Sequence, residues 1–163
     1  MRAVLSGLEV LRERGCALLQ GKRGGLVCHP ASVDADFRHV VTVLHQAPGV
    51  EMKALFGPQH GIRGETQANM IEWGGFEDPR TGLPVYSLYG EVREPTPPML
   101  EGLDALLVDL QDVGARPYTY ASTLALCMRA CAKRGIEVVV LDRPNPIDGA
   151  TLEGPVLDRT FVS

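Results

Sequence analysis

The chain has 163 residues, a formal net charge of −4 and 45% hydrophobic residues, which suits one globular domain with a substantial core. Because it has no cluster of Lys and Arg, neither a nucleic acid nor an anionic membrane is expected as its main partner. No apolar run reaches the roughly 18 residues that a membrane span requires.

The N-terminal segment 1–15 lacks the uninterrupted apolar region of a signal peptide. Its apolar residues are separated by charged ones, which are Glu9, Arg12, Glu13 and Arg14. A cytoplasmic location is therefore expected, with a secreted or periplasmic one as the alternative if the natural N-terminus lies elsewhere. The four cysteines lack the paired C-x-x-C spacing of zinc sites, so buried free thiols are expected rather than a metal or disulfides.

Apolar spacing predicts a helix, a strand, a helix and a strand in the first third of the chain. The helix covers 5–19, and the first strand covers 26–28. Ser32 or Asp34 is expected to cap the second helix. The buried face of that helix would carry Phe37, Val40, Val41 and Leu44. A strand over 50–56 follows, and this succession is typical of a βαβ unit.

The segment 57–84 is rich in Gly, Pro and polar residues and shows no sustained period. Such a long irregular segment in a compact domain is usually functional or disordered. Apolar anchors favour an ordered loop over a linker, and these are Met70, Ile71, Trp73 and Phe76.

The second half of the chain predicts three more strands and one long helix. The strands cover 85–88, 104–110 and 138–141, and a turn or short helix reaches Leu103. The helix begins near Thr119 or Ser122, and Gly135 ends it. Its buried face would carry Leu124, Cys127, Met128 and Cys131. The sum is a three-layer α/β domain over 1–163 with a mostly parallel sheet of about five strands. Its loop-like end after Arg143 predicts that it is part of a longer protein.

Two apolar runs end abruptly in polar residues, at Asp109 and Asp142. Ligands of open parallel sheets bind outside the carboxyl ends of the strands. Polar groups that follow four strand ends are therefore expected on one rim. They are His29, the cluster Gln59, His60, Arg63 and Glu65, the segment 109–120, and the group Asp142, Arg143 and Asn145.

Each polar group has a functional and a structural interpretation. In 57–65, glycines allow close backbone approach to a ligand, His60 can transfer protons and Arg63 can clamp a carboxylate. The alternative is a Gly-rich turn with a solvated Arg and a hydrogen-bonded His. Asp112 and Arg116 form either a salt bridge that fastens their loop or an anion site beside the next helix.

The remaining candidates also have both a functional and a structural interpretation. Tyr118 and Tyr120 can stack on a sugar ring or belong to the core. Two prolines hold the residues of 142–145 stiffly, for binding or as a rigid connector. Glu153 is a weaker candidate of the same kind.

Missing motifs narrow the chemistry. The chain has no G-x-G-x-x-G after its first strand and no P-loop, so only fold-level analogy supports a nucleotide-binding domain. It also lacks G-x-S-x-G, which argues against a serine hydrolase. The candidate residues that remain are Asp, Glu, Arg, Tyr and His. These residue types suit general acid–base catalysis on a polar, acidic small molecule or glycan.

Four motifs in order resemble one known family: LFGPQHGIRG, TGLPVYSLYG, DLQDVGARPYTY and LDRPNPIDG with LEGPVL. This family was long catalogued as a domain of unknown function, and its characterised members are exo-β-N-acetylmuramidases. The resemblance runs from about Gly7 to Leu157. It implies a Rossmann-like N-terminal domain that shares its cleft with a second, C-terminal domain. It also implies a peptidoglycan-derived substrate ending in N-acetylmuramic acid, and no metal or organic cofactor.

The resemblance, together with the residues of this chain itself, suggests roles for particular side chains. His60, Glu65 and Asp112 become catalytic candidates. The substrate-binding candidates are Gln59, Arg63, Glu72, Arg116, Tyr118, Asp142, Arg143 and Asn145. The family commonly has Glu where this chain has Gln59, and an amide cannot protonate a leaving oxygen. Glu65, Glu72 or Asp112 would then supply the acid. The alternative is a non-catalytic module that binds muropeptides or sugars.

Overall fold

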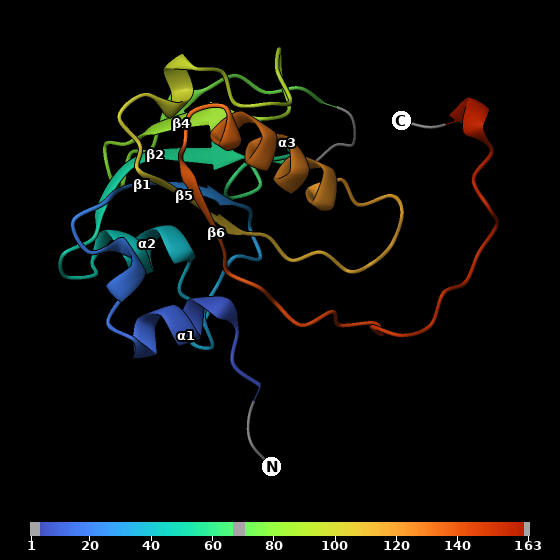
Figure 1. Cartoon of the computed structure of the whole chain (residues 1–163), viewed down its shortest axis with the longest axis horizontal. Coiled ribbons are helices and arrows are strands. Elements are labelled where there is room, and N and C mark those ends of the chain that lie inside the picture. The colour runs from blue at the N-terminus through green and yellow to red at the C-terminus, as the bar shows by residue number, and fades with distance from the viewer. Residues whose placement is uncertain (1–3, 67–70, 162–163) are drawn as a thin grey trace.

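The computed structural model describes residues 4–66 and 71–161, which form an α/β domain around one sheet (Figure 1). Its strands, within this part of the chain, are β1 (Arg23–Cys28), β2 (Glu51–Gly57), β3 (Phe76–Glu77), β4 (Pro84–Ser87), β5 (Ala105–Asp109) and β6 (Glu137–Val140). They lie in the order β3-β4-β2-β1-β5-β6, and every pairing is parallel except that of β3 with β4. The predicted mostly parallel sheet is confirmed, and the short edge strand β3 is the one that the sequence did not predict.

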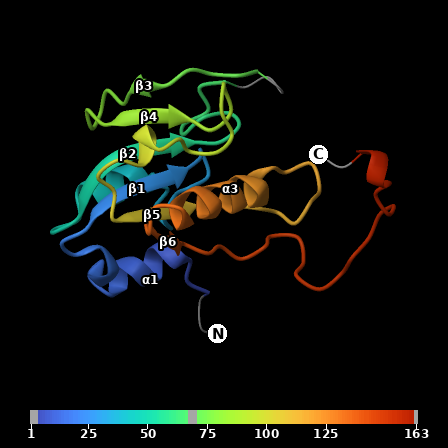
Figure 2. The ribbon, with the colours of Figure 1, turned by 45° about the horizontal axis from the view of Figure 1, so that its top comes forward.

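The helices cover both faces of the sheet (Figure 2). They are α1 (Gly7–Glu13), α2 (Val40–His45) and α3 (Tyr120–Ala132), with 3-10 turns η1 (Ala17–Leu19), η2 (Pro98–Leu100) and η3 (Arg159–Phe161). The helices α1 and α2 pack on the face that carries Leu26 and Leu55, while α3 packs on the face that carries Val27 and Phe56. Successive strand residues thus point into different cores, which explains the unbroken apolar runs. The predicted three-layer arrangement is confirmed.

The second helix begins later than predicted. It starts at Val40, and the His39 side chain accepts a hydrogen bond from the Val41 N–H. Asp34 does not cap it, because its carboxylate accepts from the Asp36 and Arg38 N–H groups and closes a separate turn. Within that turn Phe37 adopts φ 59° and is 86% exposed. Its predicted place on the buried face was therefore wrong.

Other residues that were predicted to be buried are buried in some cases and exposed in others. Cys127 and Cys131 lie in the core beneath α3, but Met128 is half exposed. Helix α1 ends at Glu13, so Leu18 falls on an exposed turn. In the irregular segment Trp73 is buried as predicted, whereas Ile71 is exposed and Met70 lies outside the described residues.

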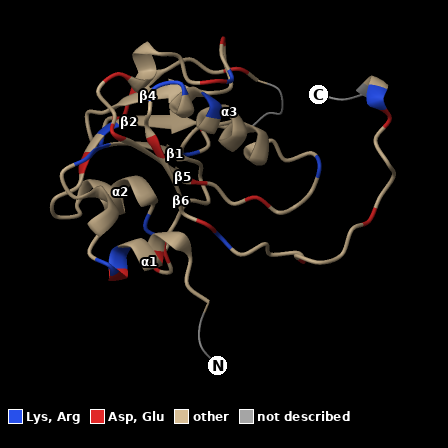
Figure 3. Ribbon diagram, viewed as in Figure 1, with Lys and Arg blue, Asp and Glu red and all other residues tan. Residues whose placement is uncertain are grey.

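Charged residues of both signs are interspersed over the ribbon (Figure 3). From Arg143 onward the described chain follows an extended path away from the sheet, where Leu152 and Val156 are almost fully exposed (Figure 1). None of the described helices is long and apolar enough to cross a membrane.

Candidate functional site

Two adjoining cavities open where β1, β2 and β5 end, at the rim that the sequence predicts. The larger has a volume of about 490 Å³ and the smaller about 290 Å³. We call them together the strand-end cavity. Its polar lining residues are His29, Gln59, His60, Thr66, Gln111, Tyr118, Thr119 and Tyr120. Converging polar groups around an otherwise apolar hollow are typical of a small-molecule site.

Another groove, of about 570 Å³, lies between α1 and β6 on a different part of the surface. Its lining is mainly aliphatic, with residues such as Leu5, Val10 and Val140. It lacks the converging polar groups that orient a ligand for chemistry. The strand-end cavity is therefore the candidate functional site.

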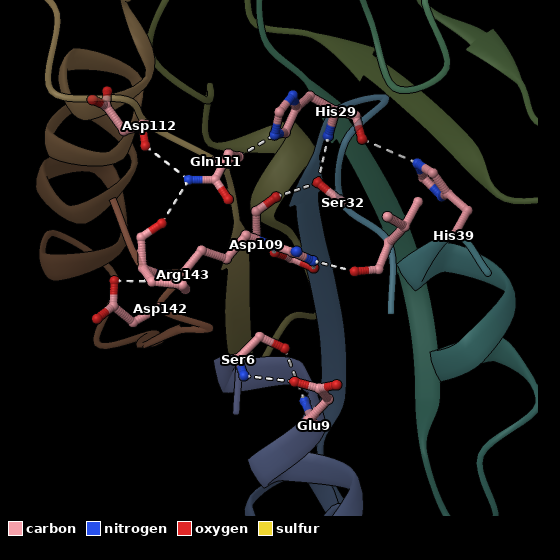
Figure 4. Close-up of polar contacts among 12 residues, drawn as sticks. Ser6, Glu9, His29, Ser32, His39, Asp109, Gln111, Asp112, Asp142 and Arg143 are labelled. Atoms are coloured by element: carbon pink, nitrogen blue, oxygen red, sulfur yellow. Dashed lines mark hydrogen bonds and ion pairs between the residues drawn. The ribbon is translucent and has the colours of Figure 1, made fainter. Parts of the chain in front are cut away.

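His29 directly follows β1 and forms part of the cavity wall. Its Nε2 accepts a hydrogen bond from the Gln111 N–H at 2.8 Å (Figure 4). The centroid of its ring lies 4.8 Å from that of Tyr120. Its own N–H donates to Ser32 Oγ at 3.0 Å, and that hydroxyl donates to the Asp109 carbonyl. Burial, followed by the positive charges of Arg143 and His39, lowers the pKa of His29 to about 4. The ring is therefore neutral at physiological pH.

His39 joins two of the loops that form the cavity. Its Nε2–H donates to the carbonyls of His29, at 3.1 Å, and Ile62, at 3.0 Å, while Nδ1 accepts from the Val41 N–H. Burial lowers its pKa, so the neutral ring is favoured. The loops after β1 and β2 are thereby held in a fixed relation.

His60 lies in the cavity wall, as the sequence predicts for a rim residue. It adopts φ 72°, a conformation that few residues other than glycine take up. Its Nδ1 donates to the Thr66 carbonyl at 2.8 Å. Gln59 and Tyr118 lie beside it in the smaller cavity. The structure thus brings three predicted site residues together.

Three other predicted residues of this region point to different partners. Arg63 forms an ion pair with the buried Asp78 at 3.3 Å. Glu65 accepts a hydrogen bond from the Arg63 N–H at 3.0 Å, and Glu72 pairs with Arg93 at the surface. None of the three lines the strand-end cavity.

The loop after β5 is folded by its own backbone. Asp112 Oδ1 accepts from the Gly114 N–H at 2.7 Å, and within the described chain Asp112 forms no ion pair with Arg116. Arg116 instead donates to the Pro155 carbonyl at 3.1 Å and lines a neighbouring open cavity with Glu153. Asn145 Oδ1 accepts from the Ile147 N–H, which favours a connector role for that residue.

Arg143 and Asp109 form a buried ion pair, and neither side chain lines the strand-end cavity. Arg143 Nη2 lies 2.9 Å from Asp109 Oδ2 and also donates to the Val33 carbonyl, while Nε donates to Asp109 Oδ1 (Figure 4). Their side chains are 10% and 0% exposed. Asp142 is exposed; its carboxylate accepts from the Arg143 N–H, and its carbonyl accepts from the Gly7 N–H. The pair is linked to the His29 loop through the Asp109 carbonyl, which accepts from Ser32 Oγ.

Thr66, Gln111 and Thr119 also line the strand-end cavity, and no sequence pattern assigned a role to these three side chains. His29 was expected on the rim without a role, and Tyr120 was expected either to stack on a sugar or to belong to the core. In 4–66 and 71–161, no Asp or Glu lines this cavity. The same residues contain no cluster of three or more His, Cys, Asp or Glu able to hold a metal ion. The four cysteines are buried free thiols, as predicted.

Comparisons with known proteins place the chain among glycosidase relatives. Residues 25–163 match the family model described as exo-beta-N-acetylmuramidase NamZ, N-terminal. The chain is 46% identical over 160 residues to the peptidoglycan beta-N-acetylmuramidase NamZ of Bacillus subtilis (strain 168), covering 98% of this chain and 38% of that protein.

Two solved structures of DUF1343 family proteins from Bacteroides fragilis NCTC 9343 share the fold. One is 46% identical with a TM-score of 0.86, covering 98% of this chain and 39% of that one. The other is 32% identical with a TM-score of 0.78, covering 99% and 40%. The chain thus spans about two fifths of the length of these relatives.

Proposed function

The chain belongs to the family of exo-beta-N-acetylmuramidase NamZ N-terminal domains, and from this premise we propose that it binds the sugar in a glycosidase. The reaction is release of terminal β-linked N-acetylmuramic acid from peptidoglycan fragments. We also propose that residues 1–163 form one domain and that a second domain completes the cleft. The share of the relatives' length that the chain spans supports the second point.

One observation carries the proposal: the strand-end cavity lies at the carboxyl edge of the sheet and offers polar and aromatic groups together. Tyr118 and Tyr120 supply ring faces, with centroids 5.8 Å apart in an edge-to-face arrangement. His29, His60 and Gln111 supply hydrogen-bonding groups. A hexose presents apolar ring faces and a rim of hydroxyls, which fits this combination.

A second function is favoured by one specific observation, which is the lack of a carboxylate in the described cavity wall. Glycoside hydrolysis commonly needs a pair of carboxyl groups, and Gln59 offers only an amide at its position. A non-catalytic module that binds muropeptides or sugars needs no such pair. Both functions require binding of the same sugar, but only the glycosidase hydrolyses it.

Two measurements test the proposal. Ligand-observed NMR with N-acetylmuramic acid and, in parallel, N-acetylglucosamine tests binding, and we expect selective binding of the former. Release of a chromophore from an aryl β-N-acetylmuramide tests hydrolysis. Turnover supports the glycosidase, whereas binding without turnover supports the binding module. Absence of binding to either sugar overturns both.

Tyr118 offers the most exposed aromatic surface in the cavity, with 47% of the residue accessible. Replacement by Ala is expected to weaken sugar binding about tenfold, since aromatic contacts contribute on the order of 1 kcal/mol beyond area burial. Tyr118→Phe keeps the ring and should bind within about threefold of the parent chain. NMR titration measures both affinities. Equal losses for Ala and Phe would exclude stacking and point to the hydroxyl.

Arg116 remains the predicted partner of the lactyl carboxylate, although it lies in the neighbouring cavity with Glu153. Arg116→Ala is expected to weaken N-acetylmuramic acid binding about tenfold and to leave N-acetylglucosamine binding unchanged. Arg134→Ala, at an exposed position beyond α3, is the matched control for loss of positive charge. Equal losses on both sugars would contradict the carboxylate contact.

A further inference from the structure

The hydrogen bonds of His29 leave one donor of its ring without a protein partner. Nε2 accepts from the Gln111 N–H, and a neutral imidazole carries its proton on the other nitrogen. Nδ1 is therefore an N–H donor. Among the residues that the structure describes, no group accepts from it, although His29 is only 5% exposed and lines the strand-end cavity. In Figure 4 the second ring nitrogen points away from Gln111.

We propose that the Nδ1–H of His29 donates a hydrogen bond to an acceptor oxygen of the sugar in the strand-end cavity, and so contributes to specificity. This inference rests on the proposed function for the identity of the ligand. Two acceptors of the sugar have the required chemistry, the lactyl carboxylate and the N-acetyl carbonyl. A ligand that covers Nδ1 removes its water, so a ligand without the matching oxygen leaves this donor unpaired and is disfavoured.

The donor is held rigidly before any ligand arrives. The Tyr120 ring packs against the imidazole at 4.8 Å, Ser32 Oγ accepts from the His29 N–H, and the Gln111 N–H fixes the ring rotation. Contacts from three separate segments thus restrain His29. A preordered donor loses little conformational entropy on binding, which favours affinity.

The surroundings of His29 favour the neutral imidazole, which carries one ring proton. Arg143, from the loop after β6, and His39, at the start of α2, disfavour a second proton, and so does burial. Asp109 of β5 is neutralised by Arg143, and Tyr120 of α3 is uncharged because burial raises its pKa above the ordinary value of 10. His29 is therefore unsuited to general acid catalysis at neutral pH.

Two substitutions separate the ligand contact from the structural bond. His29→Asn keeps a donor near Nδ1 and loses the acceptor for the Gln111 N–H. His29→Gln keeps an acceptor near Nε2 and loses the Nδ1 donor. We expect His29→Gln to bind N-acetylmuramic acid about tenfold more weakly and His29→Asn to remain within about threefold. The opposite order, or equal affinities, would overturn the inference while leaving the sugar-binding function intact.

The same titration with N-acetylglucosamine identifies the acceptor. A loss confined to N-acetylmuramic acid assigns the lactyl carboxylate, and a loss on both sugars assigns the N-acetyl carbonyl. A parent chain that binds neither sugar overturns the proposed function and this contact with it.

A second readout needs no ligand. Long-range ¹H–¹⁵N correlation spectra report which ring nitrogen of a histidine carries the proton. We expect His29 to show the Nδ1–H form throughout pH 5.5–8. An Nε2–H form or an imidazolium in that range would overturn the inference whatever the sugar-binding result.

Discussion

Replacing Arg143 with Met is expected to lower the free energy of unfolding at pH 7 by about 3–5 kcal/mol, because it leaves a buried carboxylate without its partner. Asp109 is completely buried, and Arg143 makes two contacts with its carboxylate and one with the Val33 carbonyl. Urea unfolding of the two proteins measures the difference. Asp142→Ala is the control, because Asp142 is exposed and should change stability by less than about 1 kcal/mol.

The destabilisation should depend on pH in a defined direction. Burial raises the pKa of Asp109, and hydrogen bonding to Arg143 lowers it, so removal of Arg143 raises it further. Because the pKa is then higher in the folded than in the unfolded chain, the folded variant takes up a proton as the pH falls. The difference from the parent should narrow between pH 7 and pH 4. A difference that stays constant over this range would show that Asp109 remains charged without Arg143.

Apolar patterns predicted the layers of this fold because burial on two faces leaves a clear mark in the sequence. All five residues of β5 are buried, and the 104–110 run is correspondingly apolar. The pattern failed at Phe37, which has helical spacing but lies in a turn closed by Asp34. Competition between a side chain and a helix for backbone N–H groups depends on geometry that spacing does not record.

The sequence predicted the position of the site better than it predicted which side chains line it. Loops that follow strands lie on the rim whatever their side chains do, so Gln59 and His60 after β2, and Tyr118 in the loop after β5, were expected there from topology. Charged residues on the same rim can instead pair with distant partners. Arg143 pairs with Asp109, and Arg63 with Asp78; neither pairing follows from a spacing rule. Sequence alone therefore cannot separate ligand contacts from supporting ion pairs.

Trp73 holds the loop that carries His60. We expect Trp73→Ala to lower the free energy of unfolding by as much as Arg143→Met does. Trp73 is 8% exposed, and Nε1 donates to the Pro58 carbonyl at 3.1 Å. Its ring fills the space beside Gly57, where a Cβ would lie 2.6 Å from the indole. Loss of a buried indole should lower the free energy of unfolding by about 3–5 kcal/mol.

Trp73→Ala should also loosen the cavity wall selectively. The Pro58 carbonyl that accepts from the indole also accepts from the Gly61 N–H at 3.0 Å, so both bonds hold the turn that presents His60. Hydrogen exchange of the Gly61 amide should accelerate more than that of Leu107 in β5, which reports global opening. Phe37→Ala is the matched control, since that ring is almost fully exposed. Equal acceleration at Gly61 and Leu107 would mean that Trp73 stabilises the whole domain without restraining the loop, and that His60 is positioned by other contacts.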